Sequence, residues 1–425
     1  MAIDIANEWK EFVEKNGENW ENVLKEEGID IRERDGYKIL NGPKVENGVE
    51  WSMMRQICRG MIVDKEQPTR IVSVGHLHSS SFETKDWIGK EDKERVEELE
   101  TMSEWMREKW TFFQSISKVT LALDGSQIRF WYDKEKWHLS TTRTINASYA
   151  PIYLGTRLTF YDLVADVYGW KTEEDFTKWC ESHLQKDRMY TFVLVHEMNR
   201  IVCPNKGRKE MYLVQVRNCE TLNEVALEEI EETDQWKQLP LLSNGEVKTF
   251  GDWIEEARKE EVYRKYEIGE GYMVETTVGD RLKIPFMKYE EWKGLKGSMK
   301  LFKPIFKWCD LQTPGKEQEK EKFLQYYDYY VTKFEMYDRL YQSFVRSALQ
   351  IYREVYVKRY YRLQDTDRWF YRNYLYKVHG KFLEKRKEDV KYYVKMEDME
   401  EVWRGMDAPQ RCFILTRYHR LSSSY

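Results

Sequence analysis

The sequence predicts an α+β protein in two parts: antiparallel sheets with flanking helices over residues 1–295, then an all-helical region over residues 296–425. Short runs rich in β-branched and aromatic residues, several of them alternating, occupy much of the chain before residue 290. Beyond that point such runs almost vanish, and residues 323–363 contain neither glycine nor proline. The boundary is placed where residues 290–315 have loop and linker composition.

The expected elements follow in chain order. The first thirty residues predict a helix, because apolar side chains recur at helical spacing. Strands are then expected at 37–40, 59–64, 69–74, 119–125, 126–133 and 136–142, and 123–140 is typical of consecutive antiparallel strands. Helices are expected at 90–110, 158–169 and 173–184. Strands return at 190–197, 199–202, 211–218, 271–275 and 281–286, and one or more long helices are expected over 323–363.

Composition narrows the class of protein. The 425 residues are 41% hydrophobic and 34% charged, which favours a soluble globular protein. No run of about 20 apolar residues occurs, so neither a transmembrane helix nor a membrane partner is expected. The N-terminus has no basic segment followed by an apolar run, so no secretory signal is expected. We therefore expect a cytoplasmic location. Six separated cysteines without a CxxC pair favour reduced thiols over disulfides or a zinc site.

The net charge of -5 conceals an asymmetry. From Leu301 onward there are 25 basic and 18 acidic residues, whereas the first 300 residues hold 44 basic and 56 acidic ones. The two parts are therefore expected to face different partners. A basic C-terminal part is compatible with a polyanion.

The segment VTLALDGSQIRFWY, at 119–132, contains Asp124-Gly125, which alone is an ordinary tight-turn dipeptide. Five other segments accompany it in order: RQICRGMIVD (55–64), STTRT (140–144), YTFVLVHEMNRIV (190–202), EGYMVE (270–275) and RLKIPFMKY (281–289). Together the six resemble the motifs of covalent nucleotidyltransferases. The resemblance is to ATP-dependent RNA ligases of the phage RNA ligase 1-like family, and it covers roughly half of the chain.

The resemblance assigns roles to individual residues. Ala122 occupies the position of the lysine that accepts AMP in the motif K-x-D-G, and Asp124 belongs to the same motif. Glu197 and Glu270 would be catalytic and would hold a metal, Mg²⁺ or Mn²⁺, since carboxylates suit such ions. The nucleotide, ATP, would contact Arg59, Leu121, Gly125, Phe192, Lys283 and Lys288, with Lys283 also catalytic. Arg143 would contact RNA or phosphate.

The sequence departs from the family pattern at three places. Alanine has no nucleophile, so this chain as written is not expected to form lysyl-AMP. Lys118 lies on the same strand face but about 13 Å away, too far to substitute. We interpret Ala122 as an engineered substitution of that lysine, with a natural pseudoenzyme as the alternative. At 76–83 the chain has HLHSSSFE, whereas the family has K-F-F-N. His76 and His78 either replace the lysine of that motif or have a structural or solvated role. Phe82 is expected to take the place of an aromatic residue of the motif. The final K-x-K has become Lys283-Ile284-Pro285, with Lys288 nearby.

The C-terminal part interleaves aromatic and cationic residues, as in KRYYR at 358–362. Arginine and tyrosine suit phosphate contacts and stacking on unpaired bases, which makes Arg359 and Arg362 candidate RNA contacts. A helical bundle with an aromatic core and a solvated basic face explains the same pattern. The resemblance favours RNA binding, because the phage enzyme has an all-helical C-terminal domain that helps select tRNA.

The resemblance implies an RNA ligase that joins 3′-hydroxyl and 5′-phosphate ends through lysyl-AMP and RNA-adenylate intermediates, in RNA repair. Its partners would be RNA ends, tRNA among them, and a monomer is expected, with a virus as one source of the gene. Three alternatives stay open: an mRNA-capping guanylyltransferase, a DNA ligase, and a catalytically dead homologue that only binds RNA ends. The first two normally have an OB-fold after the last motif, where this sequence predicts helices.

Overall fold

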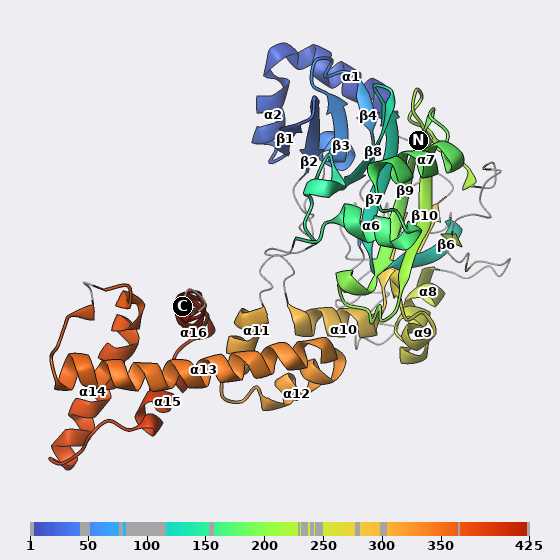
Figure 1. Ribbon diagram of the computed structural model, residues 1–425. Coiled ribbons are helices and arrows are strands. Elements are labelled where there is room, and N and C mark those ends of the chain that lie inside the picture. The colour runs from blue at the N-terminus through green and yellow to red at the C-terminus, as the bar shows by residue number, and fades with distance from the viewer. Residues whose placement is uncertain are drawn as a thin grey trace, which may run out of the picture. The chain divides into compact units, whose positions relative to one another are not determined.

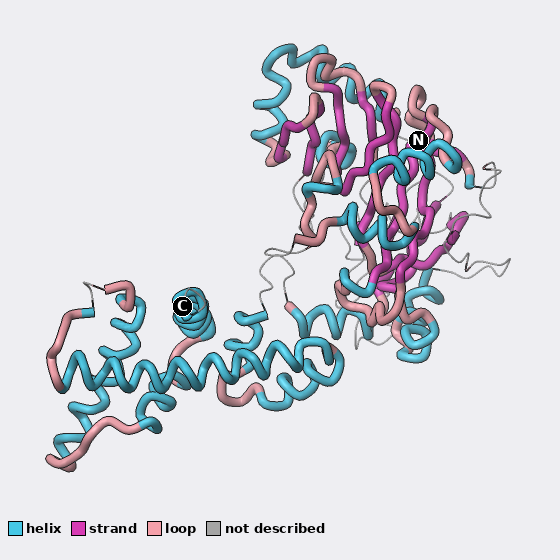
Figure 2. Tube along the Cα trace, in the orientation of Figure 1, coloured by secondary structure: helices cyan, strands magenta, loops and turns pink. Residues whose placement is uncertain are grey.

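The computed structural model describes residues 4–42, 52–75, 80–81, 116–152, 157–227, 230, 237–238, 242, 250–276, 281–297, 304–363 and 366–422. The chain divides into two compact units, Met1–Glu290 and Glu291–Tyr425. The first unit mixes helices and antiparallel sheets, and the second is built from helices, as the fold class predicted from the sequence requires. Figure 2 shows this difference, with strands in the first unit.

The first unit begins with two helices and a small sheet. The helices are α1 (Ile5–Asn16) and α2 (Trp20–Glu26), joined by the 3₁₀ turn η1 (Gly17–Asn19). The sheet has the order β1 (Asp30–Arg34), β2 (Tyr37–Asn41), β3 (Arg59–Asp64) and β4 (Ile71–Ser73), with the short helix α3 (Met53–Ile57) before β3. Trp9 and Leu24 are fully buried between the helices and the sheet. The predicted first helix is therefore present as two helices.

A second sheet forms the centre of this unit. Its strand order is β11 (Glu224–Val225), β10 (Lys209–Asn218), β9 (Arg188–His196), β7 (Ser126–Asp133) and β8 (Lys136–Thr141), and β12 (Lys237–Gln238) pairs with β10. The predicted helices α6 (Phe160–Tyr168) and α7 (Glu173–His183) lie across it in Figure 1 and bury the cluster around Phe130 and Phe192. Each begins at a capping box, at Thr159 and Thr172, which satisfies the first free N–H groups of the helix.

A third sheet has the order β5 (Ser80–Ser81), β14 (Arg281–Pro285), β13 (Gly269–Thr276) and β6 (Ile116–Leu123). One of its faces is buried, since Tyr272 of β13 packs edge-on against Trp253 at 4.9 Å and against Phe286. Trp253 belongs to α8 (Phe250–Ala257), which is followed by α9 (Glu260–Lys265). Neither helix was predicted from the sequence.

Two local expectations are corrected by the strand pairing. The run 123–140 is not one series of hairpins, because β6 pairs with β13 whereas β7 pairs with β8 and β9. Asp124-Gly125 is therefore a crossing between two sheets rather than a hairpin turn. Residues 199–202 do not form a strand either: Asn199 ends the 3₁₀ turn η5 (Glu197–Asn199), and the N–H of Val202 donates to the side chain of Asp124 at 2.8 Å.

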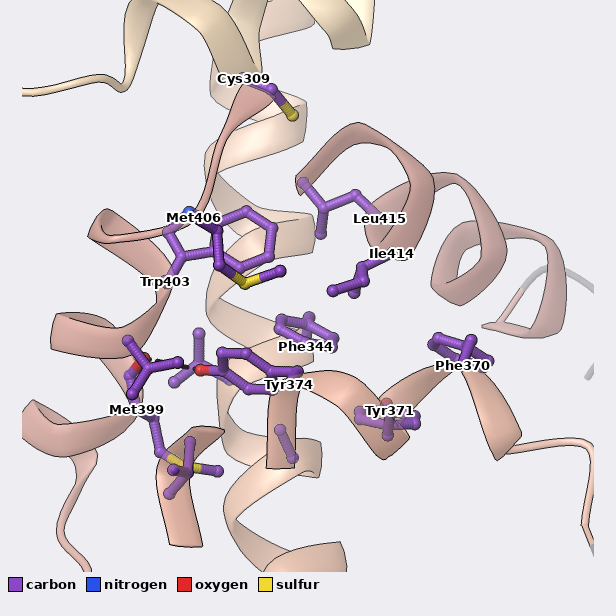
Figure 3. Close-up of a cluster of buried hydrophobic side chains, with 14 of the residues drawn as sticks. Cys309, Phe344, Phe370, Tyr371, Tyr374, Met399, Trp403, Met406, Ile414 and Leu415 are labelled. Atoms are coloured by element: carbon purple, nitrogen blue, oxygen red, sulfur yellow. Dashed lines mark hydrogen bonds between the residues drawn. The ribbon is translucent and has the colours of Figure 1, made fainter. Parts of the chain in front are cut away.

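The second unit continues α10 (Met287–Lys296) with α11 (Pro304–Leu311), α12 (Glu317–Tyr326), α13 (Val331–Tyr352), α14 (Arg372–Glu388), α15 (Met396–Arg404) and α16 (Ala408–Ser422). Short 3₁₀ turns, at Asp328–Tyr330 and Trp369–Tyr371, precede α13 and α14. Its core is aromatic, as Figure 3 shows: Phe344 of α13 packs against Tyr374 at 5.2 Å and Trp403 at 5.4 Å. The hydroxyl of Tyr374 donates to the carbonyl of Met399 at 2.7 Å.

The long-helix expectation for 323–363 holds as far as residue 352. There α13 gives way to a π-helical turn at Arg353–Val357, and the residues after it leave the helix. Arg359 has a φ of 56°, in the left-handed region that side chains disfavour. The helix predicted at 90–110, and His76, His78 and Phe82, lie outside the described residues. Among the described helices, none has the length and apolar character needed to cross a membrane.

Candidate functional site

The strand β6 places Ala122 and Leu121 on opposite faces of the third sheet. Ala122 lies opposite Gly271, and Leu121 opposite Tyr272, whose face is covered by α8. Side chains alternate along a strand, so Ala122 shares its face with Thr120. Thr120 and Lys283 both pair with Met273, which puts Lys283 on that same face. The structure therefore places Ala122, which is 5% exposed, and Lys283 on one face of the sheet and Leu121 on the other, and the nucleotide contact of Leu121 stays a prediction.

Asp124 follows β6 directly and is only 2% exposed. Its Oδ2 accepts the backbone N–H groups of Val202 at 2.8 Å and Cys203 at 2.6 Å, and its Oδ1 accepts the Tyr289 hydroxyl at 2.9 Å. Burial, reinforced by the carboxylate of Glu270, raises the pKa of Asp124. This carboxylate thus joins β6 to the segment after η5 and to the start of α10, so its role in the site is to hold backbone segments in place.

Gly125 has no room for a side chain. A Cβ at this position would lie 2.5 Å from the carbonyl oxygen of Leu194 and 2.5 Å from a methyl carbon of Val193, both in β9. The chain therefore crosses from one sheet to the other in contact with the backbone of β9. Glycine is required here by close approach rather than by its φ angle.

Glu270 and Lys283 form an ion pair at the edge of this surface, with Nζ and Oε1 2.9 Å apart. Both side chains remain about a fifth exposed, at 21% for Glu270 and 23% for Lys283, so solvent and solutes reach them. Arg59 begins β3 and is also close: burial lowers its pKa, and the charge of Glu270 opposes that shift. A carboxylate with two cations beside it is consistent with a site that holds phosphate groups and a metal ion.

Arg143 lies on a turn that contacts β3. The Thr141 hydroxyl accepts the N–H groups of Arg143 at 3.2 Å and Thr144 at 3.1 Å, which fixes the turn. A Cβ on Gly60 would lie 2.5 Å from the carbonyl oxygen of Thr142. The charge of Arg143, which is exposed, also lowers the pKa of Arg59. Arg59 and Arg143 therefore form a pair of cations held together by backbone contact.

Glu197 and Glu270 have no contact partner in common among the described residues. Its side chain is exposed at the end of β9, where its carboxylate accepts the N–H of Gly207 at 3.1 Å. The predicted pairing of the two glutamates as metal ligands is not supported by any contact within the described ranges. Those residues contain no group of three or more His, Cys, Asp or Glu side chains placed to hold an ion. A Mg²⁺ ion bound by Glu270 together with nucleotide phosphates would fit, because magnesium commonly uses one or two carboxylates and substrate oxygens.

Two of the predicted nucleotide contacts come from elements of different kinds. Phe192 is fully buried beneath α6 and α7 and packs edge-on against Phe130 at 5.4 Å, and its contact with the nucleotide stays a prediction. Lys288 is in the first turn of α10, because β14 ends at Pro285. The sequence analysis also missed Tyr289, although the quoted motif RLKIPFMKY ends on it.

Arg359 and Arg362 belong to the second unit and are both exposed. Between them Tyr360 is 69% exposed, and the Lys358 ammonium lies 5.3 Å from its ring centre. Tyr376 on α14 is 72% exposed. Most other tyrosines of this unit are wholly or partly buried in its core, so the aromatic core and the exposed basic residues expected of a helical bundle are both present, and RNA contact stays a prediction.

The contact of Gly60 with Thr142 generates a stability prediction. Gly60 and Gly169 have the same φ of 74°, but a Cβ on Gly169 would meet nothing within 4 Å. Gly169→Ala should therefore cost only the left-handed backbone penalty, about 1 kcal/mol of unfolding free energy. Gly60→Ala should cost roughly 2 to 4 kcal/mol, because the Thr142 backbone must also move. Urea unfolding of both variants measures the difference, and equal destabilisation would show that the contact imposes no constraint.

Comparisons with known proteins give a fold likeness only. No protein-family model matches the chain, and no curated protein matches it. Among solved structures, an Aquifex aeolicus protein described as an ATP-dependent DNA ligase has a TM-score of 0.39 and 13% identity, over 79% of each chain. A Naegleria gruberi RNA ligase with pyrophosphate has a TM-score of 0.29 and 14% identity, over 42% of this chain and 51% of that one. A lysine-to-alanine variant of that ligase, with ATP and Mn, has a TM-score of 0.30 and 14% identity, over 43% of this chain and 54% of that one. Likenesses this distant carry no argument about activity.

Proposed function

We propose that this chain is built as an ATP-dependent RNA ligase and that Ala122 removes its first chemical step. One observation supports this most directly. Segments spread from Arg59 to Lys283 place cations, a carboxylate and the position of Ala122 around one surface beside the Asp124 crossing. Residue types that would hold phosphates and a metal thus surround the position from which a nucleophile would act.

The cations of the surface match the charge of a nucleoside triphosphate. Lys283 is paired with Glu270, and Arg59 lies close to the same carboxylate. Bound phosphates would take over Lys283 and Arg59 as partners, which would release Glu270 to a divalent ion. That ion, when bound, would neutralise charge on the phosphate oxygens. The ion pair therefore keeps both groups in position while no substrate is present.

The first step needs a lysine at position 122. Its neutral amine would attack the α-phosphorus of ATP, a nitrogen–phosphorus bond would form, the bond to pyrophosphate would break, and one amine proton would pass to solvent. Lys283 and Arg59 would hold the negative charge of the departing pyrophosphate. The methyl group of Ala122 has no electron pair to donate, so the chain as it stands does not perform this step.

The final step uses no atom of residue 122. The 3′-hydroxyl of one RNA attacks the 5′-phosphorus of an adenylylated RNA, an oxygen–phosphorus bond forms, and the bond to AMP breaks. The hydroxyl proton passes to solvent, and AMP leaves with the electron pair. Positioning and charge stabilisation suffice for this exchange, and Arg59, Glu270 and Lys283 would provide both.

RNA is proposed as the substrate on the evidence of the second unit. Its described residues form helices and no strand, whereas a DNA ligase or a capping enzyme would normally have an OB-fold there. Exposed Tyr360 offers a ring for stacking on an unpaired base, and the exposed Arg359 and Arg362 offer contacts to phosphate. An Ala122→Lys variant can separate these rivals. Comparing its sealing of RNA strands with its sealing of DNA strands tests the DNA ligase, and comparing its use of ATP with its use of GTP tests the capping enzyme.

Restoring the nucleophile should restore the first step. Ala122→Lys, incubated with labelled ATP and Mg²⁺, is expected to acquire an acid-labile label that survives a denaturing gel. The unchanged chain is the negative control, and Thr120→Lys, two residues earlier on the same face, is the matched control for an added lysine. Absence of label on Ala122→Lys, or equal label on Thr120→Lys, would show that the nucleophile belongs elsewhere.

The RNA-binding proposal predicts a salt-dependent defect. Arg359→Ala combined with Arg362→Ala, in the Ala122→Lys background, should weaken RNA joining while self-adenylylation stays unchanged. A plot of the logarithm of RNA affinity against the logarithm of salt concentration should be less steep for the double variant than for its Ala122→Lys parent. The slope should change by about 0.7 for each phosphate of a single strand that the variant no longer neutralises. The exposed cations Lys171 and Lys178, replaced together by alanine, are the matched control in the first unit. An unchanged slope would contradict the assignment.

A further inference from the structure

Arg129 lies at the centre of β7 and is only 1% exposed. One terminal nitrogen, Nη1, donates to the Ser73 hydroxyl at 3.2 Å, and the other, Nη2, donates to the carbonyl of Thr141 at 3.0 Å. Its Nε has no hydrogen-bond partner in the described part of the chain. Burial lowers the pKa of this guanidinium to about 9.

No described carboxylate forms an ion pair with Arg129, whereas Arg217 and Arg281 of the first unit each have one. Arg217 has Glu224 at 3.8 Å, and Arg281 has both Glu224 and Glu275 within 3.0 Å. A buried charge without a counter-charge is costly, and such charges are usually paired. Within the described residues Arg129 is instead held by uncharged oxygens, as is Arg411 of the second unit.

The position of Arg129 indicates which part of the site it supports. A Cβ on Gly75 would lie 3.6 Å from Arg129 Nη1 and 3.1 Å from the carbonyl oxygen of Arg59. Thr141, whose carbonyl accepts from Arg129, fixes the turn of Arg143 through its hydroxyl. The guanidinium of Arg129 thus holds the turn that carries Arg143 and lies near the backbone of Arg59.

We propose that Arg129 is the positioning residue of a phosphate subsite formed by Arg59 and Arg143. The inference rests on the proposed function, since it concerns the same nucleotide. Arg129 fixes the Thr141 turn and the end of β4 by direct hydrogen bonds. Its buried charge would also attract an anion bound at that turn more strongly than a solvated charge would.

An arginine suits this position better than a lysine. Its planar fork reaches Ser73 and Thr141 at the same time with two separate nitrogens. A lysine would keep the charge but has one compact ammonium group, so it could not hold both segments in their present geometry. Arg129→Lys should therefore retain the electrostatic part of the effect and lose part of the positioning.

The test is equilibrium binding of ATP, inorganic tripolyphosphate and adenosine to the full chain. Ala122 is an advantage here, because ATP binds without being consumed. Arg129→Met should weaken ATP and tripolyphosphate about tenfold or more, the effect of removing one charge interaction, and leave adenosine within about twofold. Arg129→Lys should be intermediate. In both variants the effect should shrink when Arg143 is also replaced by alanine, because Arg129 acts through that turn.

Arg411 provides the matched control. It is also 1% exposed, and it donates to the backbone carbonyls of Cys309, Met406 and Arg404, within the second unit. Arg411→Met removes a buried guanidinium of the same kind and should leave tripolyphosphate binding unchanged, whatever it does to the melting temperature.

The outcomes are separable. Unchanged tripolyphosphate affinity in Arg129→Met, with a lower melting temperature, would mean a structural role only and would overturn the inference. Equal weakening of adenosine and tripolyphosphate binding in Arg129→Lys would overturn it too, since the effect would not be specific to phosphate. Tripolyphosphate binding that depends on Arg129, without any ATP preference over other nucleotides, would support the subsite and count against the ligase proposal. A chain that binds no phosphate compound at all would overturn both.

Discussion

The buried carboxylate of Asp124 is the constraint on which the candidate site depends. It lies where the chain passes from the sheet of β6 to the sheet of β7, and it accepts hydrogen bonds from the segment after β9 and from Tyr289 of α10. Leaving such buried donors unsatisfied costs roughly 1 to 3 kcal/mol each. The two sheets, the residues after η5 and the start of α10 are therefore held at one point, and the surface of Ala122 begins beside it.

Charge is distributed around this point in a way that suits a phosphate ligand. Glu270 has Lys283 as an ion-pair partner and Arg59 within electrostatic reach, and Arg143 approaches Arg59 from the turn after β8. Arg129, which donates to the Thr141 carbonyl at the start of that turn, adds a charge that no described carboxylate pairs. Cations thus outnumber carboxylates here although the first 300 residues of the chain are acidic overall, so the local field opposes the global charge.

Alternation along the strands was enough to predict most of the sheet residues, because β-branched and aromatic runs stand out between turn residues. It could not assign β6 and β7 to different sheets, since a pattern of side chains contains no information about the partner strand. Because β9 is buried on both faces, its sequence does not reveal which of its side chains face the site. The bend at 199–202 is imposed by the Asp124 carboxylate, a contact distant in sequence. Gly60 and Arg129 act through neighbours that the sequence alone does not show.

We expect the surface to be organised independently of residue 122, because Asp124, Gly125 and the Glu270–Lys283 pair hold it without any contact from that side chain. The most direct measurement is joining of a pre-adenylylated 5′ RNA to a 3′-hydroxyl RNA by the unchanged chain, without ATP. We expect sealing with this donor, at a rate reduced by the missing lysine cation, and none with 5′-phosphate RNA and ATP. Sealing of 5′-phosphate RNA would contradict the assignment of position 122. Inactivity on both donors, with an active Ala122→Lys variant, would contradict the claim that the surface alone supports the final step.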